Sequence, residues 1–491
     1  MKKTRFLFSL LMAIVMMAMS PQRMWAWGGS GTSSSPYTIA SKSDLHKFAN
    51  IVNGVGGETK NARACAKLTD DITNLGTWTP IGFNGVYTGT FDGQGHTISG
   101  ISISASSNNT GFFALIDGAT IKNFTLAGTV SSGYDNTGSV VGYAKGSSTI
   151  QDIVSTVNIT MTATKSHLGG IAGNIENGTS VLGCTYSGTL NAGSSTDSNG
   201  GIVGFANANC SGSIKYCFFN GTVKTTGSGP QMGGILGYTN DESNNFGGVQ
   251  NCYSCGTITY AGNNTYANAI IGRIRAKSHT TINNTFLSGT ATRACNEDCD
   301  EKVDFTKNKA ITISVTAGAN GTVSQTYVNP TSTTPTQLQV VATPNEHYHF
   351  GSWSDSGTQT HNVGLTNNVE LSATFAIDQH TISVATNNAN YGTVSGGGTY
   401  DWNSQQTIKA TPKPHYHLKQ WNDGNTDATR TITVTEDKTY TATFAIDQHT
   451  ITVNVANGQT DMGTVSGGGT FDYNSSKTIK ATPNTGYHFV Q

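Results

Sequence analysis

Six short segments in the first half of the chain repeat one pattern of apolar and polar positions. They read IKNFTLAGTV (121–130), IQDIVSTVNI (150–159), VLGCTYSGTL (181–190), IKYCFFNGTV (214–223), VQNCYSCGTI (249–258) and INNTFLSGTA (282–291). The first position is always β-branched and the tenth is always apolar, although a straight strand points these two positions to opposite faces. The third position is Asn, Asp or Gly in every segment except the fourth, which has Tyr216, and these residue types tolerate a left-handed turn. We therefore predict that each segment turns a corner at its third position and keeps its apolar side chains inward.

A short turn, usually rich in glycine, precedes each of these segments. The turns read GFFAL (111–115), GSVVG (138–142), GGIAG (169–173), GGIVG (200–204), GGILG (233–237) and NAIIG (268–272), at spacings of 27, 31, 31, 33 and 35 residues. Coils of this length, stacked at the spacing of about 4.8 Å between paired strands, form a parallel β-solenoid. The first turn has Leu115 in place of the closing glycine, and the last has Asn268 and Ala269 in place of two glycines. The predicted fold is all-β, with a right-handed parallel β-solenoid (β-helix).

The end of such a solenoid needs a cap, because its terminal coil exposes unpaired strand edges. Residues 43–53 have the apolar spacing of a helix, with one face formed by Leu45, Phe48, Ala49 and Val52. Ser41 or Ser43 is a suitable N-cap, and Gly54 is a suitable end. We predict that this helix covers the first coil.

A different repeat begins at about residue 310. The string ATP recurs at 342, 410 and 481, TFAIDQHTI begins at 374 and 443, and GTVSGGGT begins at 392 and 463. The period of 68–71 residues and the alternating segments predict tandem small all-β repeat domains at 310–376, 379–445 and 448–491. Trp353 and Trp421 each follow a histidine by four residues, whereas the chain stops at Gln491, before the residue that would follow His488 in the same way. We expect that the natural protein continues beyond this point.

The N-terminus has the features of an export signal. Two lysines and an arginine within residues 2–5 precede an apolar run at 6–19, which is shorter than the roughly 20 residues of a spanning helix. We predict a signal peptide at 1–26, cleaved after Ala26. No cysteine occurs before Cys65, which excludes a lipid-anchored N-terminus. The remaining predicted boundaries are 27–103 for the cap helix and first coils, 104–300 for the repeated coils and 301–309 for a linker. The mature chain is expected to be exported, with no insertion into a membrane after cleavage.

Composition narrows the possible partners. The 491 residues include 28 Lys and Arg and 29 Asp and Glu, a net charge of −1. Charged residues make up 12%, about half the usual share of roughly 25%. This balance gives no basic surface for nucleic acid. The 59 glycines favour strands joined by tight turns, and the 36% of hydrophobic residues argue against disorder.

Two parts of the chain resemble known families. The order PYTIASKSDLHKFANIVN (36–53), LTDDI (68–72), WTPIG (78–82) and YTGTFDGQGHTISGISI (87–103), followed by the glycine-rich turns, resembles exported bacterial proteins that carry GLUG motifs, over about residues 36–291. That resemblance implies a surface or secreted role, and some members belong to large proteins that include peptidases. Residues 310–491 resemble divergent internalin B-type repeats of bacteria, which implies an extended stalk or adhesive modules.

Aromatic and histidine residues of the second half have two interpretations each. Trp353 and Trp421 could stack on sugar rings, but their fixed place in each repeat favours a core position. The pairs His347 and His349, and His415 and His417, have the i, i+2 spacing of metal ligands on a strand. The third repeat has Gly486 in place of the first histidine, and no further ligand recurs nearby. A packing or surface role is therefore favoured, and no metal site is predicted.

Cysteines and carboxylates of the first half also favour structural roles. Cys184, Cys217 and Cys252 fall in one column and are predicted to be buried small hydrophobic residues. Cys295 and Cys299 are close enough in sequence for a local disulfide. Asp92 and His96 could be taken for an acid–base pair, but Gly93 and Gly95 between them favour a tight turn. No catalytic motif occurs, so neither catalytic residues nor a cofactor are predicted.

These observations favour a non-enzymatic, adhesin-like protein that is secreted or lies on the bacterial cell surface. In this hypothesis the solenoid presents loops that bind a glycan or a host surface protein, and the β-repeats act as a stalk. One alternative is a carbohydrate-active solenoid enzyme, with acid and base residues on loops near Asp135, Asp197 or Asp241 and Glu242. Another is that the chain is the non-catalytic part of a larger surface peptidase.

Overall fold

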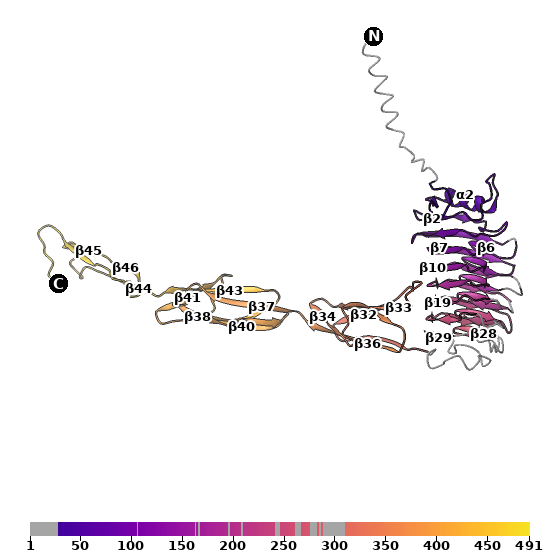
Figure 1. Ribbon diagram of the computed structural model, residues 1–491. Coiled ribbons are helices and arrows are strands. Elements are labelled where there is room, and N and C mark those ends of the chain that lie inside the picture. The colour runs from indigo at the N-terminus through magenta and orange to yellow at the C-terminus, as the bar shows by residue number, and fades with distance from the viewer. Residues whose placement is uncertain are drawn as a thin grey trace, which may run out of the picture. The chain divides into compact units, whose positions relative to one another are not determined.

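The computed structural model describes residues 28–491 except 106, 163, 165–166, 195–196, 208–209, 241–245, 261–266, 275–281, 284–285 and 288–309. The predicted signal peptide, the linker at 301–309 and the pair Cys295 and Cys299 lie outside the described residues. The chain forms two compact units: the first contains the solenoid with Ser324–Val341 and Thr360–Leu371, and the second contains Thr316–Val323, Ala342–Gln359 and Ser372–Gln491. The regular elements of the described residues are β-strands apart from one helix, so the all-β prediction is confirmed (Figure 1).

Three parallel sheets run along the solenoid, and Figure 1 shows their strands stacked coil upon coil. The 19-stranded sheet contains β1 (Tyr37–Ile39), β2 (Ala66–Leu68), β3 (Gly76–Thr77), β4 (Thr90–Asp92), β5 (Thr97–Ser104), β7 (Thr120–Ser132), β10 (Thr149–Ser155), β11 (Asn158–Met161), β14 (Ser180–Leu182), β15 (Thr185–Tyr186), β16 (Thr189–Asn191), β19 (Ile214–Lys215), β20 (Phe218–Phe219), β21 (Thr222–Lys224), β24 (Val249–Gln250), β25 (Tyr253–Ser254), β26 (Thr257–Thr259), β29 (Ile282–Asn283) and β30 (Phe286–Leu287). The six-stranded sheet contains β6 (Phe113–Asp117), β9 (Val141–Lys145), β13 (Ala172–Ile175), β18 (Val203–Ala206), β23 (Leu236–Thr239) and β28 (Ile271–Ile274). The five-stranded sheet contains β8 (Thr137–Gly138), β12 (Leu168–Gly169), β17 (Ser198–Gly200), β22 (Gln231–Gly233) and β27 (Ala267–Asn268).

The strand register confirms the columns expected from the repeats. The first-position residues are in register from coil to coil: Ile121, Ile150, Val181, Ile214, Val249 and Ile282. The last-position residues are likewise in register: Val130, Ile159, Leu190, Val223 and Ile258. Those from Ile121 to Val249 and from Val130 to Ile258 are buried and belong to one continuous apolar core. Burial of aliphatic columns between neighbouring coils is therefore the main force that holds the solenoid together.

In the five segments whose third position is described, the corner lies at that position, as predicted. The backbone angle φ is 60° at Asn123, 55° at Asp152, 61° at Gly183, 56° at Tyr216 and 54° at Asn251. Tyr216, the exception in residue type, adopts the same left-handed conformation as its neighbours. The stacking of successive coils therefore imposes the corner even on a residue that does not favour it.

The glycine-rich turns are positions of close backbone approach. A Cβ atom at Gly200 would lie 1.8 Å from the carbonyl oxygen of Val203, and one at Gly204 would lie 2.6 Å from the carbonyl oxygen of Gly173 in the preceding coil. Both contacts are with backbone atoms, which cannot move aside as a side chain can. The recurring glycines are therefore required by space inside each turn and between successive turns.

The alignment of the first turn differs from the expected one by one residue. Phe113 pairs with Val141 and Leu115 pairs with Tyr143, so Ala114 occupies the place of the closing Gly142. Leu115 is therefore not the substitute for the closing glycine. The physical reason is size, since alanine is the smallest side chain that can stand where the other coils have only a hydrogen atom.

Helix α2 (Lys42–Asn53) caps the first coils as predicted. Its N-cap is Ser41, whose hydroxyl oxygen accepts a hydrogen bond from the Asp44 backbone N–H at 3.2 Å, and Gly54 ends it in the left-handed conformation. The Phe48 ring lies 6.0 Å from the ring of Phe91 in β4, between centroids. No helix among the described residues is long and apolar enough to cross a bilayer.

Each repeat of the second half forms two small sheets. The first repeat contains β31 (Ile313–Ala317), β32 (Gly321–Val328), β33 (Gln337–Pro344), β34 (Tyr348–Trp353), β35 (Thr360–Gly364) and β36 (Val369–Ile377). The second contains β37 (Gln379–Thr386), β38 (Gly392–Ser395), β39 (Gly398–Asp401), β40 (Gln405–Pro412), β41 (Tyr416–Trp421), β42 (Thr429–Thr433) and β43 (Lys438–Ile446). The third contains β44 (Gln448–Ile451), β45 (Gly463–Ser466), β46 (Gly469–Asp472) and β47 (Lys480–Pro483). In the second repeat, the sheets β39-β37-β43-β41 and β38-β40-β42 share a core of their own around Trp421.

Candidate functional site

The two tryptophans proposed to stack on sugars are core residues. Trp353 is 2% exposed and Trp421 is fully buried. The Trp353 indole N–H donates to the carbonyl oxygen of Gln359 at 3.2 Å, and that of Trp421 donates to the carbonyl oxygen of Asp427 at 2.9 Å. A sugar ring needs an open aromatic face, and neither indole offers one. The sugar-stacking interpretation is therefore corrected, because the first and second repeats each use a tryptophan to fill a small core.

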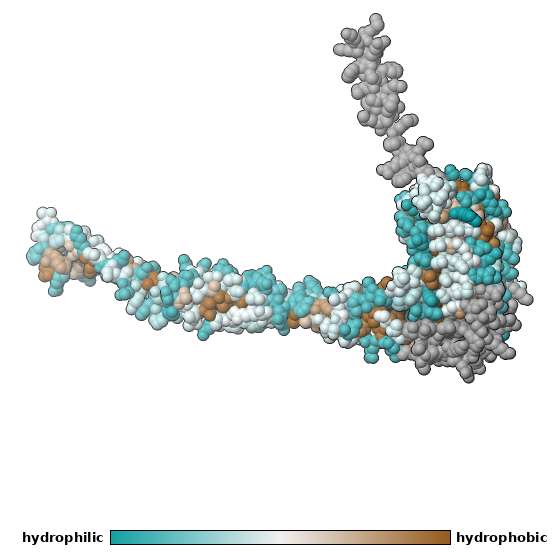
Figure 2. Space-filling view, viewed as in Figure 1, coloured by the Kyte–Doolittle hydropathy of each residue, from teal (hydrophilic) through white to brown (hydrophobic). Residues whose placement is uncertain are grey.

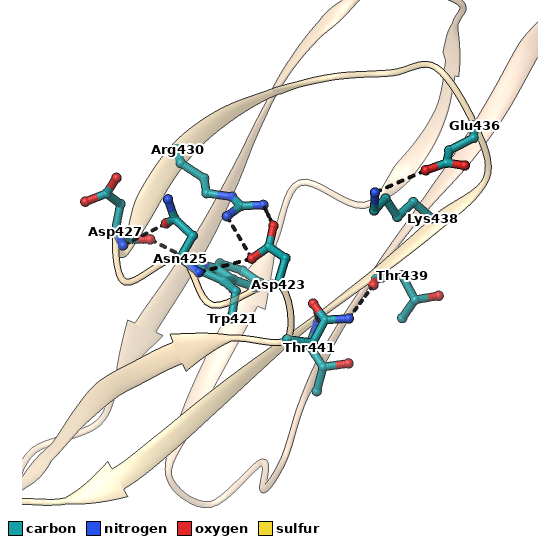
Figure 3. A network of polar contacts seen from close by, with 10 residues as sticks. Trp421, Asp423, Asn425, Asp427, Arg430, Glu436, Lys438, Thr439 and Thr441 are labelled. Carbon is teal, nitrogen blue, oxygen red and sulfur yellow. Dashed lines mark hydrogen bonds and ion pairs between the residues drawn. The ribbon is translucent and has the colours of Figure 1, made fainter.

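A polar network follows Trp421 in the second repeat (Figure 3). The guanidinium group of Arg430 forms two hydrogen bonds with the carboxylate of Asp423, one of them 3.0 Å long. These bonds are the main reason that the pKa of Asp423 lies below its usual range. The same guanidinium group lies 4.9 Å from the ring centroid of Tyr440 and 5.9 Å from that of Trp421. This network therefore fixes the loop between β41 and β42 over the core, with the Asp423 carboxylate paired to Arg430.

The four histidines of the two H-Y-H motifs do not form metal sites. His347 and His415 have φ angles of 65° and 70° and precede strands β34 and β41, so the i, i+2 alternation of a strand does not apply to them. The Nδ1 atoms of His349 and His417 instead lie 2.9 Å from carboxylate oxygens of Asp378 and Asp447. Among the described residues, no group of three or more His, Cys, Asp or Glu is placed to hold a metal ion.

The cysteine column is buried. Cys184, Cys217 and Cys252 are at most 1% exposed, and none of the described cysteines is joined in a disulfide. Burial raises the pKa of Cys217 well above its usual value, and contacts with the two neighbouring thiols raise it further. The Cys217 thiol is therefore a poor nucleophile. The burial of all three side chains makes them small apolar core residues, as predicted.

Asp92 and His96 do not form an acid–base pair. The Asp92 carboxylate accepts hydrogen bonds from the Gln94 backbone N–H at 3.0 Å and from the Asn123 side-chain amide at 3.1 Å. His96 has a different partner, since its Nδ1 atom lies 3.1 Å from a carboxylate oxygen of Asp71. These contacts fix the turn between β4 and β5, as the glycine pattern favoured.

One polar cluster on the solenoid was not identified from the sequence. The Nδ1 atom of His167 lies 2.9 Å from the hydroxyl oxygen of Ser198, which lies 3.2 Å from a carboxylate oxygen of Asp197. Burial lowers the pKa of His167, while the carboxylates of Asp197 and Asp135 oppose that change. The folding of successive coils thus brings together two of the loops named in the enzyme hypothesis. The loop with Asp241 and Glu242 lies outside the described residues.

This cluster lacks the arrangement of a serine nucleophile. In such a site the histidine lies between the acid and the hydroxyl group. Here the Ser198 hydroxyl group and the Asp197 carboxylate approach the same atom, Nδ1 of His167, at 2.9 and 3.8 Å, and Ser198 is fully buried. The His167 ring also stacks on the ring of Phe205, at 4.4 Å between centroids. The cluster therefore stabilises the outer edge of the coil.

An open groove of about 470 Å³ runs along the corner of the solenoid. It is lined by Gln94, Gly95, Asn123, Phe124, Thr125, Asp152 and Val154. Asp152 is the ionisable residue among these, and its carboxylate accepts a hydrogen bond of 3.0 Å from the hydroxyl group of Ser332, which belongs to the same compact unit. A single carboxylate that already has a partner cannot supply the two groups of a glycosidase. The groove offers polar and apolar contacts for binding and no acid–base pair for catalysis.

Comparisons with known proteins cover parts of the chain. Residues 311–379, 382–448 and 451–491 match the family of the divergent InlB B-repeat domain. Halomucin of Haloquadratum walsbyi (strain DSM 16790 / HBSQ001) is 30% identical over 154 residues, which are 30% of this chain and 2% of halomucin. The chain thus spans a very small part of that relative. The family match confirms the resemblance of the second half to B-type repeats.

Proposed function

We propose that this protein is a non-enzymatic, adhesin-like protein, exported to the cell surface or secreted. The solenoid presents loops that bind a glycan or a protein of a host surface, and the B-type repeats form the stalk. One observation carries the proposal: a single chain contains both a solenoid filled with apolar side chains and tandem repeats that match a B-repeat family. The resemblance of residues 36–291 to exported proteins with GLUG motifs and the similarity to halomucin support the same assignment.

A binding role agrees with how the polar groups of the solenoid are used. Asp92, Asp152 and Asp197 each contact a different neighbour, and the described residues do not bring two of these carboxylates into one cleft. Their hydrogen bonds hold turns and loops in place. The chemistry left at the surface is that of hydrogen bonding and apolar contact, which suits recognition.

Three exposed aromatic side chains are the best candidates for ligand contacts. Phe83, Tyr134 and Tyr260 lie outside the strands of the solenoid and are 45%, 40% and 39% exposed. Apolar residues on the visible face in Figure 2 are scattered in small groups among polar ones. Aromatic rings on loops supply contact area at low entropic cost, for sugars and for proteins alike. We infer that binding residues lie on these loops.

Binding of the exported full chain to glycan arrays and to host cells tests the proposal. We expect saturable binding, and a weaker signal when Phe83, Tyr134 and Tyr260 are changed to alanine together. Phe489→Ala, at a 62% exposed position of the third repeat, is the matched control and should bind as the unmodified chain does. Absence of binding to every surface tested would contradict the proposal, and so would release of new sugar ends from a polysaccharide panel.

A further inference from the structure

The two junctions between successive B-type repeats are built from the same backbone contacts. Asp378 is the only residue between β36 and β37, and Asp447 is the only residue between β43 and β44. The N–H of Asp447 donates to the carbonyl oxygen of His415 at 2.9 Å, and its carbonyl oxygen accepts from the N–H of Tyr473 at 2.8 Å. Asp378 makes the corresponding bonds with His347 and Trp402, at 2.9 and 2.8 Å. Each linking residue is therefore held by one repeat on either side.

Side chains repeat the same design at both junctions. The His415 ring stacks on the ring of Tyr473, with centroids 3.7 Å apart and an angle of 5° between planes. The His347 ring stacks on Trp402 in the same way, at 3.6 Å and 10°. The linking aspartates also bind the second histidine of each motif, as described above. Two independent copies of one arrangement indicate that it serves the junction.

The backbone conformation at the stacking histidine is one in which histidine is not the expected residue. His347 and His415 adopt the left-handed conformation, which is unfavourable for a residue with a Cβ atom. The third repeat has Gly486 at the same place in its motif, with φ of 87°. Glycine is the residue that this conformation ordinarily selects. Histidine at the two junctions therefore needs a compensating interaction, and the stacked ring of the next repeat supplies one.

We propose that the histidine–aromatic stack locks the orientation of each repeat against the next, so that the stalk behaves as a stiff rod. The backbone bonds through the aspartate set the distance between the repeats, and the stacked rings resist rotation about the linking residue. This inference rests on the proposed role of the B-type repeats as a stalk. The stiffness of the joint is nevertheless measured without any ligand, so failure of the binding experiment leaves its test intact.

The second junction of the full chain provides the experiment. His415→Ala removes the ring and keeps the Cβ atom, so the cost of the left-handed backbone is about the same in both chains and does not obscure the result. We expect hydrogen exchange at the Tyr473 backbone amide to rise about 2- to 12-fold, the range that corresponds to the loss of one aromatic pair. Energy transfer between labels at the exposed positions Lys419 and Lys480 should show a wider distribution of distances between the second and third repeats.

A second variant at the partner residue and a control variant show whether the stack itself causes the effect. Tyr473→Ala should have the same effect, and combining it with His415→Ala should add little, because both changes remove the same contact. Lys409→Ala, at an exposed position of β40, should leave both measurements unchanged. An unchanged distance distribution in the single variants would overturn the proposal, since the aspartate link alone would then fix the joint. Additive effects in the double variant would also contradict it.

Discussion

At the scale of single residues, the glycines of the solenoid turns differ in what an added methyl group would meet. At Gly200 it would meet the carbonyl oxygen of Val203 at 1.8 Å, whereas at Gly133 the nearest atom is the side-chain oxygen of Thr162 at 3.0 Å. We predict that Gly200→Ala destabilises the solenoid by about 3 kcal/mol, because the backbone of the turn has to shift. Gly133→Ala should cost less than about 1 kcal/mol, because the Thr162 hydroxyl group can move. Equal losses in denaturant unfolding followed by circular dichroism would contradict this explanation.

The lowered pKa of His167 predicts a dependence of stability on pH. In the unfolded chain this histidine takes up a proton near its usual pKa of about 6.5. In the folded chain burial delays protonation to lower pH. Stability from this residue is therefore complete above about pH 6.5 and is lost as the pH falls toward the pKa of the folded state. We predict that His167→Gln loses less in Tm than the unmodified chain between pH 7.5 and 5.5.

A matched substitution separates this effect from general acid denaturation. His488→Gln changes an exposed histidine of the third repeat and should lose as much Tm as the unmodified chain. Equal losses in the His167 and His488 variants would show that the buried ring does not contribute to the pH dependence.

At the scale of elements, the cap helix α2 depends on one hydroxyl group. Ser41 accepts from the Asp44 backbone N–H and also donates to the Asp44 carboxylate at 2.8 Å. Ser43, the other serine that the sequence offered as an N-cap, lies within the helix and is exposed. We predict that Ser41→Ala costs about 1 kcal/mol and that Ser43→Ala costs much less. Hydrogen exchange of the helix amides measures both, and a larger effect at Ser43 would contradict the assignment.

The elements that the sequence predicted well are those fixed by repetition. Aliphatic columns such as Ile150, Val181 and Ile214 carry their own register, because a slip by one residue would turn buried side chains outward. The expected alignment of the turn at 111–115 was wrong by one residue. Nothing in the sequence indicated that Ala114, and not Leu115, takes the place of the closing glycine. The corner at Tyr216 was predicted from the residues at the same position in the neighbouring coils, and not from the residue type of Tyr216 itself.

The contacts made between distant segments were less accessible to sequence reasoning. The stack of His415 on Tyr473 joins residues from two repeats. The sequence favoured a packing or surface role for this histidine over a metal ligand, but it did not identify the aromatic partner. One signal was present: Gly486 at the matching place of the third repeat indicated a left-handed backbone, which a strand of metal ligands does not have. The approach of His167 to Ser198 depends on how two loops of different length lie on successive coils, which no local pattern records.

At the scale of the whole molecule, the solenoid and the second repeat have separate apolar cores. The core of the second repeat contains Trp421, which shares no cluster with the buried columns of the solenoid. Removing this side chain should therefore unfold one repeat and leave the solenoid intact. We predict that Trp421→Ala destabilises the second repeat by about 3–5 kcal/mol, the usual cost of replacing a buried tryptophan by alanine. Hydrogen exchange in peptides covering β40 and β43 should rise strongly, while peptides covering β18 and β23 keep their protection. Loss of protection in the solenoid peptides would show that the chain unfolds as one cooperative unit. In that case the proposed stalk could not unfold without unfolding of the proposed binding domain.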